Sequence, residues 1–175
     1  MMRKGLFLFL ALLLPVLIFL FLHFFGKNEF DVPVLYQTAD EMPVGCELDV
    51  TLPYMVKSDK VNVTGGAVVL FASGLSNGML DDALFQLSRL EDEFGDDAPN
   101  IIVLKKSGDE LSAVKNELLM DGADYELEQR CVFLAESNRI VLVDVDTHIR
   151  GLYSNATLKE IDRLILELKI IFKQY

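Results

Sequence analysis

The chain has 175 residues and a formal net charge of −11, from 27 acidic and 16 basic side chains. This acidic balance argues against nucleic acid, and against an anionic membrane surface, as a partner of the folded part. When the apolar N-terminal segment is set aside, the rest of the chain has the length of one ordinary domain with its own hydrophobic core.

The first segment with a clear pattern is residues 5–25, which contain no charged side chain. As an α-helix this stretch would rise about 30 Å, which matches the hydrocarbon core of a bilayer. The alternative is a cleaved signal peptide, whose apolar core is usually about 7–15 residues long and is followed by small residues. The longer run, and its ending in Phe24 and Phe25, favour a retained transmembrane helix.

Charges on either side of this segment give its expected orientation. Arg3 and Lys4 precede it, whereas Lys27 is soon followed by Glu29. Because positive residues favour the cytoplasmic side, the folded part is expected beyond the membrane. The predicted organisation is a cytoplasmic N-terminus at 1–4, a transmembrane anchor at 5–25, a linker with several prolines and acidic residues at 26–52, and a folded domain at 53–175.

Beyond residue 65, the apolar pattern predicts alternating strands and helices. The expected strands cover 67–72, 100–105, 131–134, 139–145 and 148–153, and the expected helices cover 80–94, 107–119 and 157–175. Strands joined through helices pair in parallel by right-handed crossovers, whereas the last two strands form an antiparallel hairpin. The predicted fold class is therefore α/β, with a thioredoxin-like mixed sheet that carries helices on both faces.

The two cysteines, Cys46 and Cys131, lie far apart in the chain and make no metal or redox motif by their spacing. In an oxidising compartment they would form one structural disulfide. Two separate buried thiols explain them equally well, because free cysteine is often a core residue. Both interpretations stay open at this point.

Three segments carry a family likeness. They are FFGKNEFDVPV at 24–34, Cys46 followed by LPY at 52–54, and IVLVDVDTHIRGLY at 140–153 with IDRLI at 161–165. Together they resemble the Sco/SenC copper-chaperone family, in the short form found in Bacteroidetes. The resemblance covers nearly the whole chain, is weakest in the middle and is most specific in the third segment. It implies a thioredoxin-like fold and a bacterial inner-membrane protein with its domain in the periplasm.

The family binds copper through two cysteines in a Cys-x-x-x-Cys turn after the first core strand, together with a distant histidine. Soft thiolates in one turn suit Cu(I), and imidazole adds a third ligand. Carried onto this chain, the cysteine positions are occupied by Gly74 and Gly78, and the histidine position by Ser137 or Asn138. Because these positions lack metal ligands, we expect no metal, no other cofactor and no catalytic residue. A register slip of one residue, to Leu75 and Met79, supplies no thiol either.

Three alternatives depend on other residues. Met79, Cys131 and His148 would have to converge to form a rebuilt Cu(I) site. Cys46 and Cys131 would have to be neighbours for a thiol–disulfide oxidoreductase, which requires Cα atoms within about 7 Å. Finally, the backbone amides of 74–78 would bind an anion at a helix N-terminus, although glycines that permit a tight turn explain this segment more simply.

The functional hypothesis that follows is a protein without enzymatic activity. The resemblance implies an accessory or scaffold role in respiratory oxidase assembly, with a protein partner and a single membrane span but without copper. A retained fold alone does not establish such a role, because one fold supports many functions.

Overall fold

The computed structural model describes Phe9 and residues 12–21, 31–46, 51–109 and 116–172. They belong to two compact units, Met1–Asp31 and Val32–Tyr175. Residues 12–21 of the first unit are helical, but no helix in the described part of the chain is both long and apolar enough to cross a membrane. This finding overturns the transmembrane helix predicted for 5–25. The rest of 5–25, apart from Phe9, lies outside the described residues.

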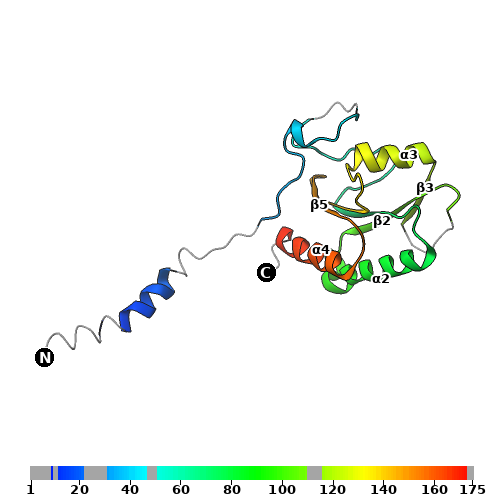
Figure 1. The fold of residues 1–175 in the computed structure, drawn as a ribbon. Helices are drawn as coiled ribbons and strands as arrows, with labels where there is room; N and C mark the ends of the chain where they lie inside the picture. Colours follow the sequence, from blue (N-terminus) through cyan, green and yellow to red (C-terminus); the bar gives the residue numbers. More distant parts are fainter. Residues whose placement is uncertain (1–8, 10–11, 22–30, 47–50, 110–115, 173–175) are drawn as a thin grey trace. The chain divides into compact units, whose positions relative to one another are not determined.

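The second unit is built on a mixed sheet of five strands in the order β3-β2-β1-β4-β5 (Figure 1). The strands are β1 (Ala67–Phe71), β2 (Asn100–Lys106), β3 (Glu117–Met120), β4 (Ile140–Val143) and β5 (Ile149–Tyr153). Strand β1 pairs in parallel with β2, and β2 in parallel with β3. Strand β4 runs antiparallel to both β1 and β5, as the hairpin pattern predicts. The unit is therefore α/β with a mixed sheet.

Helices cover both faces of this sheet (Figure 1). They are α2 (Asn77–Phe94), α3 (Gly122–Leu127), which continues into a π-helix η3 (Glu128–Val132), and α4 (Leu158–Ile171), with short 3-10 turns η1 (Ala39–Glu41) and η2 (Gly95–Asp97). Because successive side chains of a strand point to opposite faces, Val68 and Leu70 pack against α2 and α4, whereas Val69 and Phe71 pack on the side of α3. Strand β1 is thus buried on both faces.

Helix α2 forms where the sequence predicts it, for local reasons. The Ser76 side chain accepts a hydrogen bond from the Met79 backbone amide and caps the N-terminus. Gly95, with φ at +56°, ends the helix in a conformation that favours glycine. The residues that this helix buries recur at intervals of three and four, and they are Leu80, Ala83, Leu87, Leu90 and Phe94.

The predicted helix at 107–119 is wrong at its C-terminal end, where Glu117–Met120 forms strand β3. Strand β3 covers the edge of β2, with the Ser107 backbone amide donating to the Met120 carbonyl at 2.7 Å. The Lys105 ammonium also lies 3.0 Å from the Glu117 carboxylate, and both side chains are buried. These long-range contacts outweigh a weak helical pattern. Residues 110–115 of the predicted helix lie outside the described residues.

The predicted strand at 131–134 is also wrong, because Glu128–Val132 forms the π-helix η3. All four residues of 131–134 are buried, so the apolar run reflects burial rather than strand geometry. A short apolar run does not distinguish a strand from a buried helical turn.

The segment 32–46, hereafter the arm, belongs to the second unit and packs against its core, whereas the sequence predicted a linker. Val32 is buried, the Leu35 amide donates to the Ile149 carbonyl at 2.9 Å, and the Tyr36 hydroxyl donates to the Leu134 carbonyl at 2.9 Å. The compact unit therefore begins at Val32, whereas the sequence placed the domain boundary at residue 53. Residues 26–30 and 47–50 of the expected linker lie outside the described part.

Strand β5 provides a test of close packing at Gly151. A Cβ atom added to Gly151 would lie 2.8 Å from Cζ of Tyr153, whose buried hydroxyl is hydrogen-bonded to Glu167. We expect Gly151→Ala to lower the free energy of unfolding by about 1–3 kcal/mol, because the ring must move within a packed core. Urea denaturation measures this difference.

The matched control is Gly78→Ala, in the first turn of α2, where an added Cβ meets no atom within 4 Å. This change should leave stability unchanged or raise it by up to about 1 kcal/mol, because alanine is the better helix former. Equal stability of the Gly151→Ala variant and the unmodified chain would contradict the packing described.

Candidate functional site

The positions that the sequence resemblance would assign to metal ligands lie at one end of the sheet, where β1 ends and β4 begins. The Phe71 amide donates to the Arg139 carbonyl at 2.8 Å, which joins the turn after β1 to the residue just before β4. Gly74 lies in that turn with φ at +77°, and Gly78 lies in the first turn of α2. Ser137 and Asn138 directly precede Arg139. The fold therefore brings the corresponding segments together, although none of these residues is a metal ligand.

Arg139 closes this end of the sheet. Its Nη1 atom donates to the carbonyl oxygens of Phe71 at 3.3 Å and of Ser73 at 3.1 Å. The Ser73 hydroxyl donates to the Asp109 carboxylate at 2.8 Å, and the Ser73 amide donates to the Tyr125 hydroxyl at 3.3 Å. Three separate segments thus tie down the turn after β1. We name Ser73, Asp109, Tyr125 and Arg139 the β1-end network.

The β1-end network offers little acid–base chemistry near neutral pH. Burial raises the pKa of Tyr125 to about 12, so its phenol stays protonated. Asp109 accepts hydrogen bonds from the Ser73 hydroxyl and, at 3.3 Å, from the Lys106 amide. The sequence did not predict this network, because its members are distant in the chain and share no spacing that marks a motif.

A groove of about 530 Å³ lies beside this network, between the start of α2 and the segment that leads into α4. Its lining includes Leu75, Met79 and Leu158, together with Arg139. Met79 and Leu158 are more than half exposed. The groove thus presents exposed apolar side chains next to the turn after β1.

The structure does not bring together the residues of the proposed rebuilt copper site. Met79 follows the carboxyl end of β1, whereas His148 follows β4, whose last residue Val143 pairs with Ala67 at the amino end of β1. The two side chains therefore belong to opposite ends of the sheet. Cys131 offers no thiolate, because its sulfur is bonded to Cys46.

Cys46 and Cys131 form a disulfide, with an S–S distance of 2.02 Å and a Cα–Cα distance of 5.4 Å. Of the two interpretations that the sequence left open, the disulfide is correct. The bond joins the end of the arm to the π-helix η3. The Tyr54 hydroxyl donates to the carbonyl of Val132, the last residue of η3, at 2.8 Å. This hydrogen bond fixes the C-terminal end of the same helix.

Glu128, the first residue of η3, is a buried carboxylate that the sequence did not single out. One of its oxygens accepts a 2.9 Å hydrogen bond from the Ser58 hydroxyl, and the other is buried with no hydrogen-bond partner among the described residues. Burial raises the pKa of Glu128 above its usual 4.5, and the bond from Ser58 opposes this only in part. Folding therefore raises the pKa of this carboxyl group relative to the unfolded chain.

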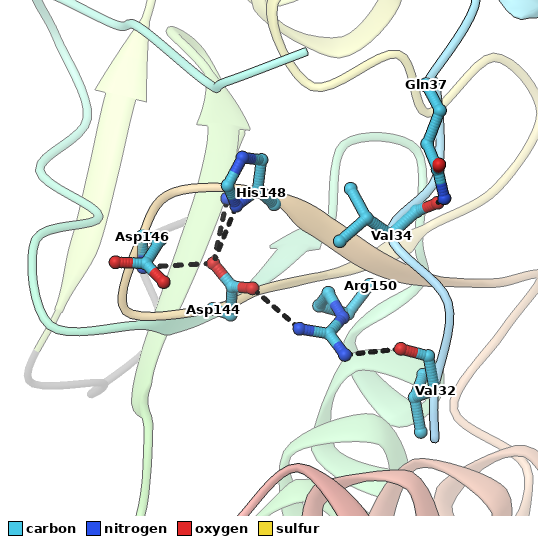
Figure 2. A network of polar contacts seen from close by, with 7 residues as sticks. All are labelled: Val32, Val34, Gln37, Asp144, Asp146, His148 and Arg150. Carbon is cyan, nitrogen blue, oxygen red and sulfur yellow. Dashed lines mark hydrogen bonds and ion pairs between the residues drawn. The ribbon is translucent and has the colours of Figure 1, made fainter. Parts of the chain in front are cut away.

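A second polar cluster lies at the turn between β4 and β5 (Figure 2). Asp144, Asp146 and His148 place one ligand atom each within 4.8 Å of one another, as a metal site would. Asp144 Oδ1, however, accepts hydrogen bonds from the backbone amides of Asp146 at 3.0 Å and His148 at 2.9 Å. The side chain thereby organises the hairpin turn.

The other oxygen of Asp144 points to Arg150, as Figure 2 shows, with Oδ2 2.9 Å from Nη1. The same guanidinium donates to the carbonyl oxygen of Val32 at the start of the arm. A cation paired with the central carboxylate opposes the binding of a second, divalent cation. We therefore interpret the cluster as a structural link between the hairpin and the arm.

Comparison of the chain with protein-family models and with curated proteins finds no match. The resemblance to the Sco/SenC family therefore stays a prediction from the sequence segments, and the functional argument depends on the geometry above.

The role of Asp144 can be tested by substitution. Asp144→Ala should lower the free energy of unfolding by about 2–3 kcal/mol, because two part-buried backbone amides and the Arg150 guanidinium lose this acceptor. Asp144→Asn should lower the free energy of unfolding by less, since the amide oxygen of asparagine can still accept hydrogen bonds from the two backbone amides. The control is Asp146→Ala, because this carboxylate is exposed. A variant Asp144→Ala as stable as the unmodified chain would contradict the structural role.

The burial of Glu128 predicts a pH-dependent stability. A carboxyl group whose pKa is raised on folding stabilises the native state below its unfolded pKa, and this contribution is lost as the pH rises through the folded pKa. We expect Glu128→Gln to be more stable than the unmodified chain at pH 7–8, by on the order of 1 kcal/mol.

The advantage of Glu128→Gln should shrink as the pH falls and disappear below about pH 4, where glutamate becomes protonated in the unfolded chain as well. Urea titrations across this range measure it, with the exposed Glu126→Gln as control. A pH-independent difference would show that charge burial is not the cause.

Proposed function

We propose that the folded unit is a non-catalytic accessory or scaffold domain, related to the Sco/SenC copper chaperones, that acts by binding a protein partner in respiratory oxidase assembly. The observation that carries the proposal is the β1-end network. At the place where the resemblance puts a Cu(I) site, glycine, serine and asparagine replace the ligands, and Arg139 bonds to the carbonyl oxygens of Phe71 and Ser73.

The available donor atoms support the absence of a copper function. Cu(I) prefers thiolate and thioether sulfur, with imidazole as a further ligand. Near the β1-end network the groove supplies a single soft atom, the sulfur of Met79, while both cysteines are bonded to each other. One exposed thioether does not make a tight site, so the alternative of a rebuilt copper chaperone is less well supported.

Surface properties favour a basic protein segment as the partner. The chain has a net charge of −11, and the groove beside the network combines exposed Met79 and Leu158 with the carboxylate of Asp82. A partner segment with an apolar side chain next to lysine or arginine complements both features. The disulfide also agrees with an oxidising compartment such as the periplasm.

Cu(I) titration of the full-length chain tests the proposal. The disulfide is kept intact by maintaining Cu(I) anaerobically with ascorbate and no thiol, and a colorimetric Cu(I) chelator competes for the metal. We expect the chain to remove no copper from the chelator, because the described groove offers Cu(I) only the thioether of Met79, which alone binds weakly. Tight binding of one copper per chain would overturn the proposal.

A matched gain-of-ligand variant locates the ancestral site. Gly74→Cys, Gly78→Cys and Asn138→His together should create a chain that competes for Cu(I), if the three positions correspond to the family's ligands. Gly74 has φ at +77°, so the variant is first checked for folding by circular dichroism. A folded variant that still fails to bind would count against the resemblance on which the proposal rests.

A further inference from the structure

A pocket of about 540 Å³ lies at the end of the sheet opposite to the β1-end network. Val143, which pairs with Ala67 at the amino end of β1, belongs to its lining, whereas Leu70 near the carboxyl end of β1 lines the groove described above. The segments that lead into β1 and β2 and the end of α4 complete the wall. The volume is within the range of ligand pockets, roughly 300–1,000 Å³.

The inner surface of this pocket is apolar. Leu168, Ile171 and Phe172 line it at the end of α4. The ring of Phe172 packs edge to face against Phe94, with the ring centroids 5.5 Å apart, so its position is fixed by the core. Val145, which follows β4, also contributes to the lining and is more than half exposed. A ligand with a large apolar side chain would therefore remove apolar surface from water here.

One side of the pocket is strongly acidic. Five acidic residues lie within seven positions, and they are Glu91, Asp92, Glu93, Asp96 and Asp97. Asp96 and Asp97 of η2 are exposed and line the pocket. Within the part of the chain that the structure describes, the Lys169 ammonium pairs with Glu93, and the other four carboxylates make no ion pair. This acidic rim, residues 91–97, therefore carries an excess of negative charge.

The charges of the acidic rim do not serve the helix that carries them. The last turn of α2 contains three acidic residues and no basic residue. The C-terminal end of a helix is the negative end of its dipole, where carboxylates are unfavourable, and neighbouring carboxylates also repel one another. A cationic ligand would relieve both effects. Charges that oppose local stability without a compensating contact in the fold are typical of functional surfaces.

We propose that this pocket and its acidic rim bind a basic segment of a partner protein. An aromatic or large aliphatic side chain of that segment enters the pocket, and adjacent lysine or arginine side chains lie against Asp96 and Asp97. A small polyamine would satisfy the rim but leave the apolar surface in water, which favours a peptide segment. The site is independent of the function proposed above, because it uses a different pocket at the other end of the sheet.

The chain contains no tryptophan, so a tryptophan in a peptide probe gives an unambiguous signal. The probe is a synthetic peptide with one tryptophan between two pairs of lysines, titrated with the full-length chain. We expect saturable one-to-one binding and a blue shift of the tryptophan emission, because the ring leaves water. A peptide with alanine in place of the tryptophan should compete about ten-fold more weakly. No saturation, or saturation without a blue shift, would show general attraction to an acidic surface and overturn the proposal.

The acidic rim is tested by a pair of substitutions. Asp96→Asn combined with Asp97→Asn should weaken binding of the tryptophan peptide about three- to ten-fold, as expected for two exposed charges. The matched control, Asp40→Asn combined with Asp81→Asn, changes the net charge equally at two exposed positions outside the pocket. The control should bind as the unmodified chain does. Equal weakening by both pairs would mean that only the net charge matters.

The pocket itself is tested at its exposed edge. Val145→Lys places a cation where the proposal requires an apolar surface, and it should weaken binding at least about ten-fold. The matched control is Val44→Lys, at an exposed position on the arm outside this pocket. Both side chains are exposed, so both variants should fold, which circular dichroism checks. Equal affinities of the Val145→Lys and Val44→Lys variants would place the peptide elsewhere and overturn the proposal.

Discussion

The burial of strand β1 on both faces is the constraint on which the rest of this unit depends. Its five residues are almost completely inaccessible, with parallel β2 on one edge and antiparallel β4 on the other. Both faces therefore need a covering layer, which α2 and α4 provide on one side and α3, η3 and the arm on the other. The turn that follows β1 leaves the core at the sheet's carboxyl end, where the β1-end network forms.

Much of this layout could be predicted from the sequence. Strands β1 and β2, helices α2 and α4 and the β4–β5 hairpin each carry a strong local pattern of the correct period. Strand β3 has a weak pattern, since it is short and half exposed and is held by the buried Lys105–Glu117 pair across the strand edge. The apolar run at 131–134 reports burial, which a helical turn and a strand share.

The candidate sites were predictable only in part. The positions of Gly74, Gly78 and Asn138 followed from the resemblance, and the fold does bring their segments to one end of the sheet. Arg139, Tyr125 and Glu128 gave no local signal, because each acts on groups that are distant in the chain. The pairing of Cys46 with Cys131 likewise depends on how the arm packs. The arm shows no periodic pattern of apolar residues, because its backbone is irregular even where its side chains pack against the core.

The position of the arm determines how this chain can be divided. Arg150, which is paired with Asp144 in the hairpin, donates to the Val32 carbonyl at the start of the arm. Further along the arm, the Tyr36 hydroxyl donates to the Leu134 carbonyl. A fragment that begins at Pro53 would therefore keep the whole sheet but lose one wall of the core, and Cys131 would be left without its partner sulfur. The smallest self-sufficient piece of this chain begins no later than Val32, well before its first strand.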